Sequence, residues 1–397
     1  MSAVLNRRRA ERILSEAGID VIVGTSYQNV YYLSGYQGFG QRLTPSTQAY
    51  AIAQVSDLSA PVVVAPISDL DMEAQFPSGA RMHPYGRFFM EGPSGGRLSE
   101  ELARYERVAF PCEPRSSAAG SLIEELASLP TSARIALDES FISAAARQAL
   151  LARFGDRVVD GAELLSRIRM VKTEEEVRRL EAAANAIEAS YLAALDAAHE
   201  GMSEAEMAIV FDQKTIQSGS APHFTVIAFG ERGAFPNAIP SADRRLRKGD
   251  VIRFDIGCRT ELYSSDIART AVFGEPSAKV SAYYDAILAG EDRMLDAMRP
   301  GVTAKAVFHA AVEGTRAAGI PHYQRHHVGH GVGLDTYDPP LLSESTETLL
   351  EVGMVFEVET PYYEIGFAGL QVEDTVVITE DGYRMLTRTP RELVVVD

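Results

Sequence analysis

The sequence has few cysteines, an excess of acidic over basic residues and no long apolar run. Its 397 residues include two cysteines, Cys112 and Cys258, which lie far apart and cannot form a disulfide framework. No apolar run approaches the roughly 18 residues that a membrane-spanning helix needs. The opening stretch, MSAVLNRRRAERILSEAG, is charged and amphipathic and lacks the apolar centre of a signal peptide. We therefore expect a cytoplasmic protein that does not enter a membrane.

Basic residues are outnumbered by acidic ones. Lys and Arg total 38 against 55 Asp and Glu, which gives a net charge of -17, and the arginine clusters are short. Because such a charge repels polyanions, nucleic acid is a poor partner. The carboxylate excess suits a protein that holds cations, and it also suits a solvated acidic surface.

The order of hydrophobic segments predicts two domains. In residues 1–155, strand-like runs such as those at 20–26, 60–67 and 107–113 alternate with helical segments, which indicates an α/β domain. In residues 160–397, a capping box (Thr173 with Glu176) opens a long amphipathic helix. Strands, a pair of helices near 277–298 and 303–318, and further strands follow, so this domain is predicted to be α+β.

Four carboxylates of the second domain interrupt segments that otherwise resemble apolar strands. A buried, ionised carboxylate is costly unless it is paired or binds a cation. Any one of these acids can point to solvent because strands alternate faces, but four in one domain favour a cation site. They are Asp255 in VIRFDIG, Asp266 in YSSDIART, Glu359 in MVFEVET and Glu373 in LQVEDTVVI. The first two are 11 residues apart, a spacing that lets adjacent antiparallel strands point both acids at one spot.

A histidine- and glycine-rich stretch, HHVGHGVGLDTYDPP at 326–340, adds His330 as a nitrogen donor. Four carboxylates and one imidazole form an oxygen-rich set that suits two divalent cations sharing carboxylates. Such a centre can turn water into a nucleophile near neutral pH. The lack of a cysteine cluster argues against a structural zinc site.

Five segments in this order resemble the creatinase, prolidase, aminopeptidase P and methionine aminopeptidase superfamily: FDIG, SSDIART, HHVGHGVGLD, FEVETPYY and QVEDTVVITEDG. The segments RMVKTEEEV and SYQNVYYLSGY resemble its two-domain prolidase and creatinase branch. The resemblance covers nearly the whole chain. It implies an α+β fold, with a creatinase-like N-terminal α/β domain at 1–155 and a pita-bread catalytic domain at 160–397.

The resemblance also implies the roles of the metal-binding residues. Asp255 would chelate one metal ion, His330 and Glu359 would hold the other, and Asp266 and Glu373 would bridge the two. Glu359 would also act as the acid and base that moves the proton of a metal-bridging water. The oxygen-rich ligation favours manganese over zinc, with cobalt, zinc or iron as the alternatives.

Other residues near the site are assigned by the same resemblance. His326 matches a family position that lines the substrate pocket, and we count it among the catalytic residues. Its neighbour His327 is interpreted as a solvated loop histidine. The glycines of the HHVGHGVG segment would let the backbone approach the metal site. Cys258 is interpreted as a packing residue.

Three pocket positions depart from the peptidase pattern. Tyr337, in TYD, and Asn237, in GAFPNAIP, stand where peptidases of the family have histidines, and Gln371, in LQVED, stands where they often have arginine. Asn and Tyr can still donate hydrogen bonds to a substrate, but they cannot carry a proton as imidazole does. His223, in APHFTVIAF, is either a compensating substrate residue or a half-buried histidine satisfied by the backbone.

Three functions remain open. The intact ligand set favours a dinuclear amide hydrolase of the Xaa-Pro dipeptidase or aminopeptidase type, acting on a small peptide. The three departures favour a hydrolase of a small non-peptide amide or cyclic amidine, like creatinase or ectoine hydrolase. A catalytically silent binding relative is the third reading. The family also implies a homodimer, with YLSGYQGFGQR as the predicted contact segment.

Overall fold

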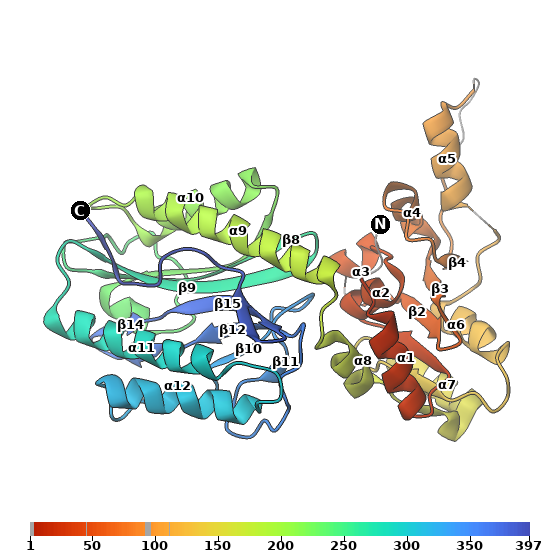
Figure 1. Cartoon of the computed structure of the whole chain (residues 1–397). Coiled ribbons are helices and arrows are strands. Elements are labelled where there is room, and N and C mark those ends of the chain that lie inside the picture. The colour runs from red at the N-terminus through yellow and green to blue at the C-terminus, as the bar shows by residue number, and fades with distance from the viewer. Residues whose placement is uncertain (1–3, 45, 92–96, 111) are drawn as a thin grey trace. The chain divides into compact units, whose positions relative to one another are not determined.

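The computed structural model describes residues 4–44, 46–91, 97–110 and 112–397. The chain forms two compact units, of which the first ends at Arg169 and the second begins at Met170 (Figure 1). Each unit has its own sheet and its own hydrophobic core.

The first unit is built on a six-stranded mixed sheet with the order β4-β3-β2-β1-β5-β6. Central strand β1 pairs antiparallel with β2 and parallel with β5, and all of its residues are buried. Because both faces of the strand are covered, its sequence is a continuous apolar run. The strands are β1 (Val21–Gly24), β2 (Tyr50–Gln54), β3 (Asp57–Pro66), β4 (Arg81–Tyr85), β5 (Ile135–Leu137) and β6 (Val158–Asp160). The α-helices are α1 (Arg7–Glu16), α2 (Tyr27–Ser34), α3 (Phe39–Leu43), α4 (Asp71–Gln75), α5 (Glu100–Ala109), α6 (Ala118–Ala127), α7 (Ala144–Phe154) and α8 (Ala162–Arg169), with short 3₁₀ turns η1 (Ile67–Asp69) and η2 (Gly155–Arg157).

One predicted strand of this unit, at 107–113, is wrong. Its first residues end helix α5, and position 111 lies outside the described residues. The helix begins at Ser99, whose side chain accepts a hydrogen bond from the backbone N–H of Leu102, and two glutamates follow in its first turn. This cap and the favourable acidic first turn outweigh the short apolar run.

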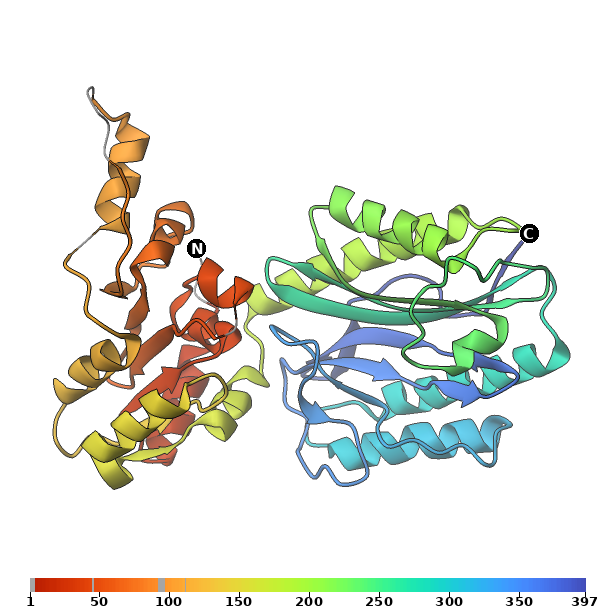
Figure 2. The same cartoon turned by 180° about the vertical axis from the view of Figure 1, so that it is seen from behind.

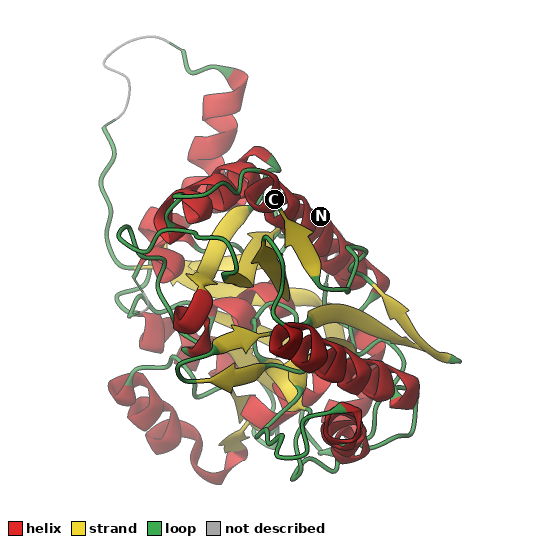
Figure 3. Ribbon diagram, turned by 90° about the vertical axis from the view of Figure 1, so that its left-hand side faces the viewer, coloured by secondary structure: helices red, strands yellow, loops and turns green. Residues whose placement is uncertain are grey.

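The second unit has a nine-stranded sheet between two pairs of helices. Figures 1 and 2 show α9 and α10 on one face of this sheet and α11 and α12 on the other, and Figure 3 shows its strands between helices in a view turned by 90°. The order is β11-β10-β12-β15-β9-β8-β7, with β16 paired to β15 and β17 to β9. The predicted α+β arrangement is therefore confirmed.

The helices predicted near 277–298 and 303–318 agree with the observed α11 and α12, whereas strands β10, β11 and β17 were not predicted. Its α-helices are α9 (Glu174–Asp196), α10 (Glu204–Gln217), α11 (Ala278–Ala297) and α12 (Ala304–Ala318), and its 3₁₀ turn is η3 (Gly230–Ala234). Its strands are β7 (Ala221–Phe229), β8 (Val251–Thr260), β9 (Tyr263–Phe273), β10 (Gly329–Gly331), β11 (Asp338–Leu341), β12 (Val355–Glu359), β13 (Tyr362–Glu364), β14 (Ala368–Leu370), β15 (Glu373–Thr379), β16 (Gly382–Met385) and β17 (Val394–Val396).

Strand alternation decides which side chains of β8 reach the core under α9 and α10. Ile252, Phe254, Ile256 and Cys258 belong to that core, so Cys258 is a packing residue as expected. The residues between them face the opposite side of the sheet. Asp255 therefore points to the other face, where the metal site is predicted.

The capping box of α9 supplies a test of stability against pH. Burial raises the pKa of the Glu176 carboxyl from its ordinary value of 4.5 to about 7, although Thr173 and Tyr263 donate hydrogen bonds to it. The folded state thus holds a proton that the unfolded state releases, and the stability that this group contributes falls as pH rises from about 4.5 to 7. We expect Glu176→Gln, which keeps the capping bonds, to remove this loss.

Urea unfolding of the variant and of the unaltered protein at pH 5 and pH 8 measures the effect. The free energy of unfolding of the variant minus that of the unaltered protein should be larger at pH 8 than at pH 5. Glu174→Gln changes an exposed glutamate of the same helical turn and serves as the control. A stability difference that does not vary with pH would contradict the assignment.

Candidate metal centre

Strands β8 and β9 carry the two predicted aspartates on one face of the sheet. They form a continuous antiparallel ladder that turns at Thr260 and Tyr263, with Asp255 opposite Ala268 and Gly257 opposite Asp266. Because residues two apart on a strand share a face, both aspartates point to the same side. The 11-residue spacing thus acts as predicted.

The next strands bring the other predicted ligands to this face. Glu359 of β12 is directly opposite Glu373 of β15, which is opposite Ala268 of β9. His330 of β10 is opposite Glu357 of β12. Five neighbouring strands, in the order β10-β12-β15-β9-β8, therefore bring one predicted ligand each to this face.

The site is compact and buried. Ligand atoms of Asp266, His330 and Glu373 all lie within 4.8 Å of one another, and Nε2 of His330 lies 3.9 Å from Oδ2 of Asp266. The carboxylates of Asp255 and Glu359 line the same pocket, whose volume is about 290 Å³. Each of these two carboxylates lies close to a nitrogen of a neighbouring side chain. Oδ2 of Asp255 lies 3.1 Å from Nη1 of Arg253, and Oε1 of Glu359 lies 3.1 Å from Nδ1 of His327.

The charges of the site call for a cation. Burial raises the pKa of Asp266 and of Glu373 well above their usual values, and the neighbouring carboxylates raise them further. Burial also raises the pKa of Asp255 to about 6, against the opposing charge of Arg253 and with a further rise from Glu359. Facing carboxylates of this kind repel one another unless protons or a metal ion lie between them.

The hydrogen bonding of His330 fits a metal ligand. Its Nδ1 lies 3.0 Å from the carbonyl oxygen of Gly331, so Nδ1 carries the proton and Nε2 offers a lone pair. Within the described parts of the chain, neither that Nε2 nor Oδ1 of Asp266 has a hydrogen-bond partner, although both atoms are buried. Buried acceptor atoms without a hydrogen-bond partner, placed beside two further carboxylates, are suited to bind divalent cations through oxygen and nitrogen.

Two glycines allow β10 to lie this close to its neighbours. At Gly329, where φ is +134°, a Cβ atom would lie 2.1 Å from the carbonyl oxygen of Glu357. At Gly331 it would lie 2.6 Å from the carbonyl oxygen of Pro339. These glycines let β10 lie against the backbone of β12 and β11. The approach of this backbone to a metal ion stays a prediction.

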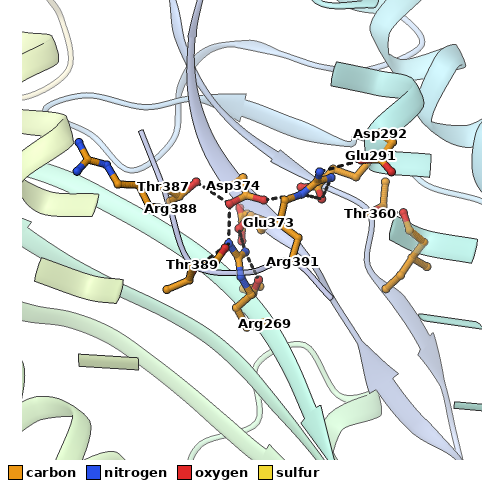
Figure 4. Close-up of polar contacts among 12 residues, drawn as sticks. Arg269, Glu291, Asp292, Thr360, Glu373, Asp374, Thr387, Arg388, Thr389 and Arg391 are labelled. Carbon is orange, nitrogen blue, oxygen red and sulfur yellow. Dashed lines mark hydrogen bonds and ion pairs between the residues drawn. The ribbon is translucent and has the colours of Figure 1, made fainter. Parts of the chain in front are cut away.

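A buried polar network anchors β15 beside the site. Figure 4 shows Asp374 joined to Arg269, Thr387 and Arg391, with Arg391 reaching on to Glu291. Arg269 also donates to the carbonyl oxygen of Glu373 itself. The network fixes the strand segment that carries Glu373, the predicted bridging carboxylate, as outer-shell contacts do around metal ligands.

The pocket contains most of the predicted substrate residues. Asn237, His326, Tyr337 and Gln371 line it. The ring of Tyr337 stacks on that of His330, with centroids 3.7 Å apart. His223 is not brought to the pocket, which corrects its reading as a compensating residue. His223 lies at a bulge near the start of β7, and its Nε2 atom lies 3.5 Å from Nη2 of Arg259.

Three residues of the candidate site were missed by sequence reasoning. His327 is buried and contacts Glu359, so its interpretation as a solvated histidine is wrong. Arg253 is fully buried beside Asp255, and the period-two alternation of β8 could have placed it on that face. Arg325 lines the pocket, and nothing in its sequence context marks it.

A mixed two-unit fold with a convergent carboxylate and histidine site defines a metal-dependent hydrolase. Residues 178–380 match the model of metallopeptidase family M24, and residues 7–171 match the creatinase/prolidase N-terminal domain. The chain belongs to metallopeptidase family M24, in the two-domain, prolidase-like form, and its second unit is the pita-bread domain. None of the described helices is both long and apolar enough to span a membrane.

Individual relatives agree with this assignment. The Xaa-Pro dipeptidase of Pyrococcus furiosus is 37% identical over 234 residues, which are 58% of this chain and 67% of that enzyme. The solved prolidase of Pyrococcus furiosus matches with a TM-score of 0.74 and 27% identity, over 96% of this chain and all of that one. Dipeptidase PepE from Mycobacterium ulcerans matches with a TM-score of 0.78 and 28% identity, over 98% and 96% of the two chains.

Proposed function

We propose that the protein hydrolyses the amide bond of small Xaa-Pro peptides with two divalent metal ions. Asp255, Asp266, His330, Glu359 and Glu373 would hold them. The observation that carries the proposal is the convergence of Asp266, His330 and Glu373, which are all buried and offer ligand atoms within 4.8 Å of one another, beside a pocket that Asp266 and Glu373 line. The volume of the pocket, about 290 Å³, is at the lower limit of the roughly 300 to 1,000 Å³ that is usual for ligand pockets, which suits a small substrate. Similarity to an Xaa-Pro dipeptidase supports the peptide class.

When bound, the metal ions would activate water and polarise the scissile carbonyl. Glu359 serves as the general base and acid: it accepts the proton of the attacking water and returns it to the leaving nitrogen. Burial raises the pKa of Glu359, but the His327 contact and the charge of Arg325 bring it below its usual value. The carboxylate is therefore ionised and ready to accept a proton at pH 7.

Asn237 and Tyr337 are the hydrogen-bond donors proposed for the substrate carbonyl. Burial and the nearby carboxylates raise the pKa of Tyr337, so its hydroxyl keeps its proton at neutral pH. Burial, together with His327 and Arg325, lowers the pKa of His326, which is therefore a neutral imidazole. Each group can orient the substrate without competing with Glu359 for the transferred proton.

A second function has a specific observation in its favour. Asn237, Tyr337 and Gln371 all line the pocket and differ from the usual peptidase residues. Such a pocket also suits a small non-peptide amide or a cyclic amidine. We further propose manganese as the metal, a cytoplasmic location and a homodimer with residues 32–42 in the contact.

The proposed function predicts metal-dependent turnover of Xaa-Pro dipeptides. Protein purified in chelator should be inactive, and added Mn²⁺ should restore hydrolysis by at least about 10³-fold, because a catalytic metal contributes several kcal/mol to transition-state stabilisation. Liquid chromatography of the released proline measures the rate, with creatine and ectoine as the non-peptide arm. Turnover of creatine or ectoine without turnover of the dipeptides would contradict the peptide assignment. So would the lack of turnover of all these substrates with Mn²⁺, Co²⁺, Zn²⁺ and Fe²⁺.

A further inference from the structure

Two arginines lie against the ring of Tyr363 at the wall of the pocket. The guanidinium carbons of Arg253 and Arg325 lie 5.3 Å and 5.5 Å from the ring centroid. Tyr363 itself lines the pocket, and its hydroxyl donates to Gln371 over 3.3 Å. The aromatic ring therefore holds two cations close to the proposed reaction centre.

The first arginine is fully engaged by the protein. The Nη1 atom of Arg253 donates to Asp255 and Gln371 over 3.1 and 2.9 Å. Its Nη2 atom donates to the carbonyl oxygens of Phe235 and Pro236 over 2.9 and 2.8 Å. With no exposed surface, Arg253 is a positioning residue that ties together the pocket walls, and it has no room for a further anion.

The second arginine is available to a ligand. In the described residues Arg325 makes no ion pair, its buried Nε has no hydrogen-bond partner, and it is the only lysine or arginine that lines the pocket. Two divalent ions would already balance the four pocket carboxylates, and in the part of the chain that the structure describes none of these carboxylates forms an ion pair with Arg325. A guanidinium held on an aromatic face is suited to bind a carboxylate.

We propose that Arg325 binds the substrate carboxylate, so that the substrate is a dipeptide with a free C-terminus rather than a longer or amidated peptide. The inference rests on the proposed function, because it places the scissile carbonyl at Asp266, His330 and Glu373. It makes Arg325 the residue that restricts the protein to dipeptidase action.

The test compares Ala-Pro with Ala-Pro amide, which differ only in the carboxylate. The Mn²⁺-loaded protein should show a kcat/KM for the acid roughly 10- to 100-fold above that for the amide, the range of a charge-assisted hydrogen bond. Arg325→Gln should abolish this preference, because the constant for the acid falls about 10- to 100-fold more than any change in the constant for the amide, and Arg325→Lys should restore part of the preference. Arg259→Gln, outside the pocket, should change neither constant.

A binding measurement separates this inference from the proposed function. Isothermal titration of L-proline and L-prolinamide into the unaltered Mn²⁺-loaded protein should show tighter binding of proline, and Arg325→Gln should remove that difference. Hydrolysis of neither substrate would overturn the proposed function and leave this titration to decide on Arg325. Equal constants for acid and amide, a preference that survives in Arg325→Gln, or equal binding of proline and prolinamide would overturn the inference.

Discussion

Replacing Glu373 by alanine is expected to abolish hydrolysis, and replacing Asp266 by alanine is expected to do the same. Each carboxylate supplies an oxygen to the group that lies within 4.8 Å, and each is proposed to bridge the two metal ions. Loss of a bridge removes several kcal/mol of transition-state stabilisation, which corresponds to at least about 10³-fold in kcat/KM. Activity on an Xaa-Pro dipeptide and metal content by mass spectrometry measure the effect together.

A matched control separates the loss of a ligand from the loss of charge. Glu380→Ala removes an exposed glutamate that follows the same strand, β15, and should leave activity and metal content unchanged. If Glu373→Ala kept near-native turnover with two metal ions still bound, the bridging role would be wrong. A folded but metal-poor Glu373→Ala protein would support it.

The sequence predicted the part of the site that depends on local rules. The spacing of Asp255 and Asp266 and the alternation of strands placed both aspartates on one face, and β8 and β9 are joined by a tight turn, so their register is local. The order β10-β12-β15-β9 is not local: it pairs residues separated by long stretches of chain. Composition and periodicity contain no signal for such pairing. His330, Glu359 and Glu373 could be picked out as candidates, but their assignment to the same pair of metal ions came from the family resemblance.

The residues that were missed depend on contacts between distant segments. His327 precedes β10 in a segment without regular structure, and its burial comes from packing beside Glu359, which no periodicity reports. A buried arginine such as Arg253 is tolerated because Phe235, Pro236 and Gln371 bring acceptors from elsewhere in the unit. His223 was misplaced because a bulge in β7 interrupts the register of its strand.

Replacing Glu359 by glutamine is expected to lower kcat by roughly 10²- to 10⁴-fold, the usual range for a general acid or base. Glutamine has nearly the same shape and can keep the contacts with His327 and Gln371, which lie 3.1 and 3.4 Å away. It cannot accept the proton of water. The side-chain carbonyl oxygen of glutamine can still serve as a metal ligand beside Asp266, His330 and Glu373, so metal content and KM should change little.

Glu357 provides the control for this prediction, because it lies two residues earlier on the same face of β12 and is fully buried. Burial, together with nearby acids, raises its pKa to about 8, so at pH 7 it is mostly protonated and Glu357→Gln mimics its native state. That variant should keep its activity where Glu359→Gln loses it. If the Glu359→Gln protein were inactive and had also lost its metal, the result would show only that Glu359 is a metal ligand. If the variant were fully active, Glu359 would not be the residue that transfers the proton.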